Sequence, residues 1–168
     1  MDGTFAVLFL LAGAADMGIN YCGDPGCVAA NPAQARLAIS YGDVIFQEKK
    51  IGHEVYARYD LGVQYGPFQP TVGLSVSDKG DTWVGGGAAW TGYIDQAYIQ
   101  LHLMPGFHAQ GRGPQIGTVL EFRSGVELGY EAHNGIRYGV SYDHRSNAEL
   151  SETNPGLETM QFRISFPM

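Results

Sequence analysis

The chain has 168 residues, enough for one domain with a single core or one small barrel. Twenty-four glycines and ten tyrosines, with only three lysines, are typical of many short strands joined by turns rather than of long helices. The formal net charge of −7, with the basic residues scattered along the sequence, argues against a nucleic-acid partner, because phosphate binding needs clustered Lys and Arg.

The N-terminal segment, residues 1–34, is open to two interpretations. An apolar run over residues 5–11, followed by Ala12-Gly13-Ala14-Ala15, has the features of a signal-peptide core and cleavage site. However, Asp2 stands where a signal peptide carries basic residues, and the run is shorter than the roughly 20 apolar residues of a transmembrane helix. The alternative is that the segment remains on the protein and packs as an extra strand or a membrane-facing plug.

Two cysteines, Cys22 and Cys27, lie in a loop rich in Gly, Asp and Pro. An even number of cysteines in an exported protein predicts one small disulfide with a structural role. The predicted organisation is therefore an N-terminal extension over residues 1–34, which contains the Cys22–Cys27 loop, and a β-barrel domain over residues 35–168.

From residue 36 onward, apolar and polar residues alternate with a period of two, which is the signature of β-strands. Val55, Ala57 and Tyr59, for example, lie on one face, while the neighbouring Arg58 and Asp60 lie on the other. Eight strands are predicted, near residues 36–46, 53–65, 68–77, 82–93, 97–109, 116–131, 134–147 and 157–166. This number and length predict an all-β fold, an eight-stranded antiparallel up-and-down transmembrane β-barrel.

The composition of the polar face indicates which side of the barrel points outward. It mixes glycine and serine with charges of both signs and almost no lysine, as expected of a packed lumen with internal ion pairs. Aromatic residues near strand ends, among them Trp83, Trp90 and Tyr130, suit the girdles of a membrane barrel. The pattern favours a membrane barrel, and a soluble ligand-binding barrel is the alternative.

Three side chains that could perform chemistry fall on the face expected to contact lipid. His144 and Ser146 continue the apolar parity of their strand, and Glu158 continues that of Met160 and Phe162 on the last strand. Since the two strands can be antiparallel neighbours, Glu158 is expected near His144. Ser, His and a carboxylate are what nucleophilic acyl transfer requires, although such residues also mark the places where strands leave the membrane.

Other polar residues receive a structural interpretation. Asp143 is not favoured as the acid, because its parity points into the lumen. The remaining histidines lack metal-ligand spacing, the glycines at 85–87 suit tight packing, and residues 78–81 suit a charged turn better than a calcium site. The histidines in question are His53, His102, His108 and His133.

The stretch Asp143-His144-Arg145-Ser146-Asn147-Ala148, followed by Asn154-Pro155-Gly156-Leu157-Glu158, resembles the active-site region of the lipid A 3-O-deacylase (PagL) family. Members of that family are eight-stranded outer-membrane barrels of Gram-negative bacteria. The shared pattern is His-x-Ser-Asn, a short loop, Asn-x-Gly, and a Glu that follows the Ser by twelve residues. The resemblance covers about the last 45 residues, since residues 127–130 and 134–139 are also similar to the family.

The resemblance implies a role for each of these positions. Ser146 is the expected nucleophile, His144 the general base and Glu158 the acid that orients it, with Asn147 and Asn154 at the oxyanion hole. The implied reaction is hydrolysis of the 3-O-linked acyl chain of lipid A, part of lipopolysaccharide, in the outer membrane, without a metal or organic cofactor. The alternative function is a non-catalytic barrel of the same scaffold, a structural or partner-binding component that forms a homo-oligomer or binds another membrane protein.

Overall fold

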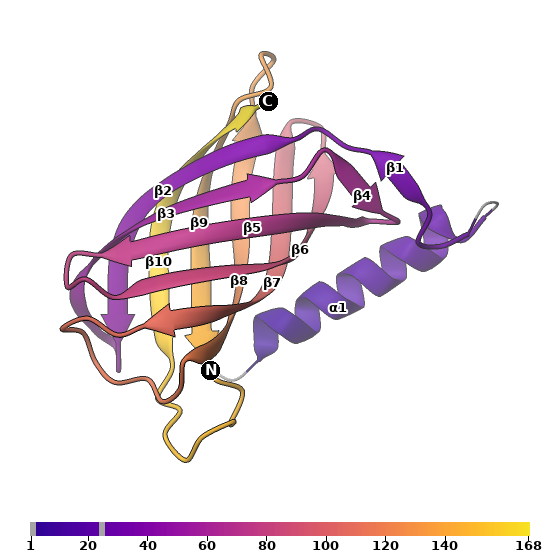
Figure 1. Ribbon diagram of the computed structural model, residues 1–168. Coiled ribbons are helices and arrows are strands. Elements are labelled where there is room, and N and C mark those ends of the chain that lie inside the picture. Colours follow the sequence, from indigo (N-terminus) through magenta and orange to yellow (C-terminus); the bar gives the residue numbers. More distant parts are fainter. Residues whose placement is uncertain (1–2, 24–25) are drawn as a thin grey trace.

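The computed structural model describes residues 3–23 and 26–168. An N-terminal helix, α1 (Thr4–Asp16), continues into one π-helical turn, η1 (Met17–Tyr21), and the rest of the described chain is built from strands (Figure 1). The strands are β1 (Ala30–Pro32), β2 (Arg36–Phe46), β3 (Lys49–Asp60), β4 (Val63–Tyr65), β5 (Phe68–Ser77), β6 (Thr82–Ile94), β7 (Ala97–Ala109), β8 (Leu120–Glu131), β9 (Arg137–Ser146) and β10 (Leu157–Pro167).

Eight of these strands form a closed antiparallel barrel. Their order around the wall is β5-β3-β2-β10-β9-β8-β7-β6, and pairing of β5 with β6 closes the ring. The short strands β1 and β4 pair with each other beside β5 and extend the sheet at one end (Figure 1). The predicted eight-stranded barrel is thus confirmed, and most strand bounds agree closely. The second barrel strand is displaced, since β3 begins at Lys49 and ends at Asp60 instead of covering 53–65.

The charged face of the strands points into the lumen and the apolar face points outward, as the composition predicts. Outward-facing side chains such as Val55, Phe107 and Phe162 are exposed, whereas Arg123 and Glu54 are buried inside. This distribution is typical of a transmembrane barrel, whose outer surface faces lipid. The alternative of a soluble barrel with an apolar interior is wrong, because the interior carries the charges.

The lumen is held mainly by ion pairs, beside one small buried cluster of Tyr56, Trp83 and Met104. Arg123 contacts Asp143 at 2.7 Å and Glu54 at 2.9 Å, and its guanidinium lies 3.9 Å from the centre of the Tyr56 ring. Arg145 adds a second contact to Glu54, at 2.9 Å. Buried charges are tolerated only when they are paired in this way, because an isolated buried charge is very costly to remove from water. Asp143 is therefore a structural residue of the lumen, as its parity predicts.

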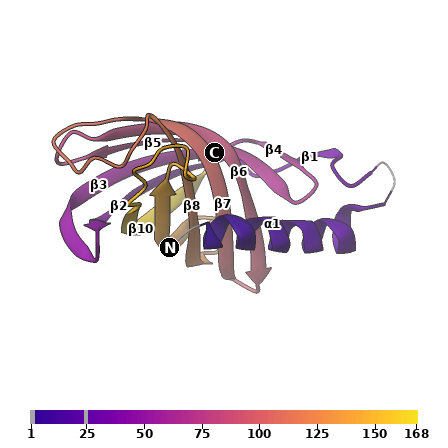
Figure 2. The ribbon, with the colours of Figure 1, turned by 90° about the horizontal axis from the view of Figure 1, so that it is seen from below.

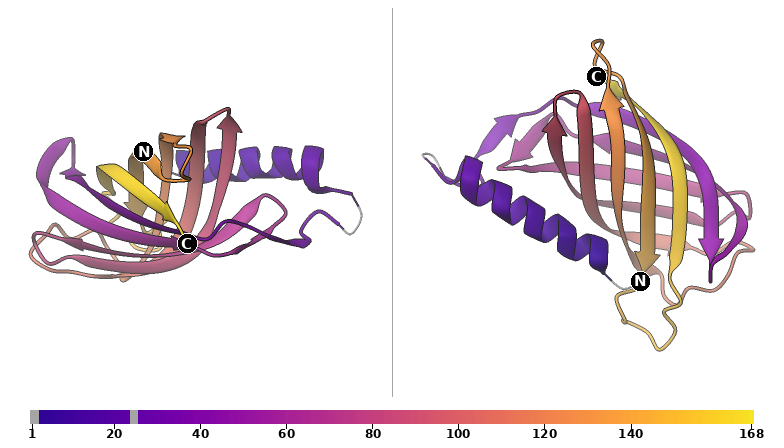
Figure 3. Two further views of the ribbon diagram at one scale, coloured as in Figure 1. Left: turned by 90° about the horizontal axis from the view of Figure 1, so that it is seen from above. Right: turned by 180° about the vertical axis from the view of Figure 1, so that it is seen from behind.

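The apolar run of the N-terminal segment forms a helix, so the expectation that this run packs as an extra strand is wrong, although residues 30–32 of the segment form the short strand β1. Figures 2 and 3 show α1 outside the barrel, where it lies against the wall formed by β6, β7 and β8. Together with η1 it is long and apolar enough to cross a membrane, a property that signal sequences share. The predicted disulfide is confirmed, since Cys22 and Cys27 are bonded, in the connection that leads from the helix to β1.

Candidate active site

The predicted catalytic residues lie on two neighbouring strands, β9 and β10. Their antiparallel register places Glu158 directly opposite His144, while Ser146 is the last residue of β9. On the other side of β9, Ser124 of β8 lies opposite His144 and Phe122 lies opposite Ser146. Because side chains alternate along a strand, His144, Ser146 and Glu158 all project from the outer wall.

His144 and Glu158 form a close polar pair on this wall. The imidazole Nδ1 lies 3.3 Å from Glu158 Oε1, and the exposed fractions of the two side chains are 5% and 16%. On a surface made otherwise of hydrocarbon, a carboxylate beside the imidazole satisfies both groups and fixes the orientation of the ring. With Nδ1 facing Glu158, Nε2 lies on the opposite side of the ring.

Ser146 lies two residues beyond His144 on the same face, at a Cα separation of about 7 Å along the strand. The alternation along β9 therefore places Ser146 and His144 next to each other on the outer wall. Catalytic hydrogen bonds are often long before substrate binds and tighten in the complex.

The loop that follows Ser146 is held by the Asn147 side chain. Its buried amide Nδ2 lies 2.8 Å from Ser151 Oγ, 2.7 Å from the Thr153 carbonyl oxygen and 3.3 Å from that of Ile116. The next two residues, at 148 and 149, have φ angles of 51° and 62°, and the chain reverses there as in a type I′ turn. The buried amide thus stabilises a turn that residues other than glycine rarely adopt.

Asn154 is oriented by the same loop. Its side-chain oxygen Oδ1 accepts a hydrogen bond of 3.1 Å from the Asn147 backbone N–H. Because the backbone N–H can only donate, this contact fixes which end of the amide is the oxygen and leaves the NH₂ group on the other side. Asn154 also lines the groove that contains Ser146. The two predicted oxyanion residues therefore differ in position: Asn147 anchors the loop and Asn154 faces the groove.

Gly156 lies behind the imidazole and was not singled out in the sequence. It has a φ of +71°, and a Cβ atom at this position would lie 2.7 Å from His144 Cε1. A side chain here would be both strained and in collision with the ring. The Asn-x-Gly pattern contained the signal, but only the packing shows that the glycine makes room for His144.

A groove on the outer wall contains Ser146. It has a volume of about 360 Å³, at the small end of the range of ligand pockets. Its walls come from the strands β7, β8 and β9, the loop after Ser146, and the start of the N-terminal helix. The lining residues are Gly3, Ala6, Leu103, Phe122, Ser124, Ser146, Ala148, Glu149 and Asn154.

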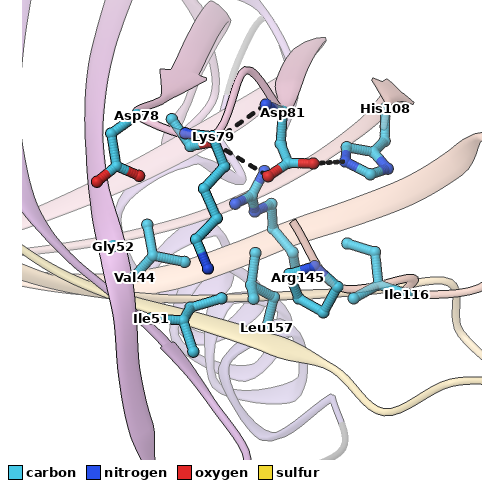
Figure 4. Close-up of a pocket in the computed structure, with 12 residues that line it drawn as sticks. Val44, Ile51, Gly52, Asp78, Lys79, Asp81, His108, Ile116, Arg145 and Leu157 are labelled. Carbon is cyan, nitrogen blue, oxygen red and sulfur yellow. Dashed lines mark hydrogen bonds and ion pairs between the residues drawn. The ribbon is translucent and has the colours of Figure 1, made fainter. Parts of the chain in front are cut away.

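A second hollow lies at the mouth of the lumen and is shown in Figure 4. Arg145 and Leu157, the neighbours of the predicted catalytic residues on β9 and β10, point into it, together with His108 and Asp81 (Figure 4). Neither Ser146, His144 nor Glu158 lines this hollow. The alternation of the strands thus separates a charged inner pocket from the outer groove.

The glycines at 85–87 act as packing elements in this structure. Gly85 and Gly87 of β6 allow close approach of the β7 backbone. Cβ atoms at these positions would lie 2.5 Å from the Pro105 carbonyl oxygen and 2.1 Å from that of Leu103. Among residues 3–23 and 26–168, no group of three or more His, Cys, Asp and Glu side chains could hold a metal ion.

The sequence is related to one family of barrel enzymes. Residues 59–167 match the family model described as lipid A 3-O-deacylase (PagL). A 52-residue stretch is 35% identical to the lipid A deacylase PagL of Bordetella bronchiseptica, and it covers 31% of this chain and 29% of that relative. The chain thus aligns with less than a third of the length of this curated relative.

The fold resembles several solved barrels. The crystal structure of the outer membrane enzyme PagL matches with a TM-score of 0.62 and 16% identity, over 79% of this chain and 99% of that one. A de novo designed transmembrane β-barrel gives 0.58 and 11%, over 82% and 98%, and the Neisserial surface protein A gives 0.54 and 6%, over 83% and 99%. At these identities the likeness concerns the fold alone.

Proposed function

Because the chain belongs to the lipid A 3-O-deacylase (PagL) family and is an outer-membrane β-barrel, we propose that it hydrolyses the 3-O-linked acyl ester of lipid A, with Ser146, His144 and Glu158 as its catalytic residues. The observation that carries this proposal is the His144–Glu158 pair on the lipid-facing wall, 3.3 Å apart and two residues from a serine in a groove. A lipid substrate can reach that wall by lateral diffusion, without leaving the bilayer.

In the first half of the reaction His144 Nε2 accepts the proton of Ser146 Oγ as this oxygen attacks the ester carbonyl carbon. Glu158 holds the imidazole through Nδ1 and stabilises the positive charge that develops on the ring. The ester C–O bond then breaks, the sugar hydroxyl leaves with the proton from His144, and the acyl chain remains on Ser146.

In the second half a water molecule gives its proton to His144 and attacks the acyl-serine. The fatty acid is released and the proton returns to Ser146 Oγ. Asn154 donates through its amide NH₂ to the oxyanion in both halves, since its Oδ1 is occupied by the backbone of the preceding loop. Asn147 is a positioning residue in this scheme, because it acts through the loop and through Asn154.

The test compares lipid A from cells that express the wild type, Ser146→Ala or Ser141→Ala, by mass spectrometry. Ser141 is a matched control, because it lies on the same strand but is buried in the lumen. We expect loss of one 3-linked acyl chain with the wild type and with Ser141→Ala, and intact lipid A with Ser146→Ala. The heat-dependent gel shift of folded barrels checks that each variant is assembled.

Two outcomes would contradict the proposal. Deacylation by Ser146→Ala at the wild-type level would remove Ser146 as the nucleophile. Intact lipid A with all three proteins, when each is folded in the outer membrane, would overturn the lipid A assignment and favour the non-catalytic barrel.

A further inference from the structure

The N-terminal helix covers a strip of the lipid-facing wall. Leu101 and Ser124 face outward, yet only 4% and 5% of their surfaces are exposed. On the same strands the outward-facing Phe107 and Leu128 are 64% and 60% exposed. The helix lies over β6, β7 and β8, and Figure 3 shows it running obliquely beside these strands. The strip under α1 is therefore shielded from lipid, while the wall beyond it is open.

Specific contacts fix the helix in this place. Phe9 is buried, with its ring centroid 5.3 Å from that of Phe68. Gly13 allows the helix to approach, because a Cβ atom there would lie 2.2 Å from Phe68 Cε1. Near the end of α1, Asp16 Oδ2 accepts a hydrogen bond of 2.8 Å from Trp90 Nε1. An apolar helix with only a targeting role has no need of a small residue and a carboxylate that match the barrel surface at two points.

The chain after the helix is also held at the barrel. The Cys22–Cys27 disulfide closes the connection, and the carbonyl oxygen of Ala29 accepts a hydrogen bond of 3.2 Å from the Gly66 N–H. Strand β1 then pairs with β4. These contacts restrict how far α1 can move from the wall.

The start of the helix reaches the groove at Ser146. Gly3 and Ala6 line it together with Phe122 and Leu103, and the Phe5 ring centroid lies 5.8 Å from that of Tyr142 on β9. Gly3, at the N-cap of α1, and Ala6 are both small and leave open the space beside the nucleophile. We propose that α1 stays on the mature barrel as one wall of the acyl-chain groove, and that Ala6 sets which acyl chains reach Ser146. The inference rests on the proposed ester hydrolysis and adds the residue that determines its chain selectivity.

The first test asks whether the helix is present on the mature protein. The full chain is expressed, purified from outer membranes and analysed by intact mass and N-terminal sequencing. We expect a mature protein that contains residues 4–21. A mature N-terminus after Tyr21, with ester hydrolysis retained, would overturn the inference and leave the proposed function standing.

The second test measures selectivity with Ala6→Leu and the matched control Ala14→Leu, which makes the same change on the exposed side of the same helix. The substrates are nitrophenyl esters of octanoic, dodecanoic and hexadecanoic acid in detergent micelles. Because methylene groups in an apolar pocket change rates steeply, Ala6→Leu should shift the ratio of kcat/KM between the longest and shortest esters by about tenfold or more. Ala14→Leu should keep the wild-type ratio.

The outcomes of the second test separate the proposed ester hydrolysis from the proposed role of α1 in the groove. Equal ratios for wild type, Ala6→Leu and Ala14→Leu would show that the helix does not form the groove. Absence of Ser146-dependent deacylation of lipid A by the wild type would instead overturn the proposed function, and the inference with it. If Ala6→Leu fails to assemble, Ala6→Val in the same assay takes its place.

Discussion

Gly156→Ala tests whether the position of His144 depends on the glycine behind it. The new methyl group would lie 2.7 Å from His144 Cε1, whereas ordinary contacts begin at 3.4 Å, so the ring must retreat by 3.4 − 2.7 = 0.7 Å. The imidazole already lies 3.3 Å from Glu158, and its displacement disturbs both that contact and the approach to Ser146.

The size of the effect follows from this displacement. A misplacement of about 1 Å at a reacting group can reduce the rate by roughly a factor of 100. For 0.7 Å we expect kcat/KM to fall by about 10- to 100-fold, equivalent to about 1.4 to 2.7 kcal/mol of lost transition-state stabilisation. A separate cost in stability, about 1–2 kcal/mol, comes from placing a Cβ atom at a φ of +71°.

The matched control is Gly80→Ala. Gly80 has a φ of +83° and no atom within 4 Å of its Cβ position, so the variant carries the backbone strain without the collision. The assay is hydrolysis of a dodecanoyl nitrophenyl ester by folded barrels in detergent, with thermal unfolding measured in parallel. Activity of Gly156→Ala within a factor of two of Gly80→Ala would refute the argument, because strain alone would then account for the change.

The remaining predictions concern the proton relay, the oxyanion and the lumen. Glu158→Gln should lower kcat by about 10³- to 10⁴-fold, because an amide does not stabilise the imidazolium; ester kinetics check this, and a loss below tenfold would exclude Glu158 as the orienting acid. Asn154→Ala should reduce kcat about 10²- to 10³-fold with little change in KM, whereas a pure KM effect would indicate a role in binding alone. Asp143→Asn should leave Arg123 without its closest carboxylate and destabilise the barrel by about 3–5 kcal/mol in urea unfolding, and a change below 1 kcal/mol would mean that Glu54 alone balances the arginine.

The strands could be predicted from the sequence because each depends on a local pattern. A period of two, interrupted by turn residues, gives both the position of a strand and the face it presents. The prediction was inaccurate for β3, where Lys49 and Lys50 extend the strand toward the turn. There the hydrogen bonds to β2 decide the boundary, since Lys49 pairs with Phe46, and such pairing is not encoded by the alternation.

The N-terminal segment shows the opposite case. Its apolar residues carry no alternation and no strong amphipathic pattern, so the sequence left its role undecided. The helix is placed by contacts with residues far along the chain, among them Phe68 and Trp90. No local pattern of residues 1–34 contains that information, because complementarity is a property of two surfaces.

For the candidate site, the sequence by itself determined that His144, Ser146 and Glu158 share the lipid-facing side, because parity along a strand is a local property. It also determined the charged lumen, since the same alternation places the arginines and carboxylates together inside. The sequence also predicted that Glu158 lies near His144, and the register of β9 and β10 agrees. Only the tertiary structure decided that Asn154 rather than Asn147 faces the groove and that Gly156 makes room for the imidazole. Strand register, loop packing and the docking of α1 are set by contacts between distant segments, and these exist only once the barrel has closed.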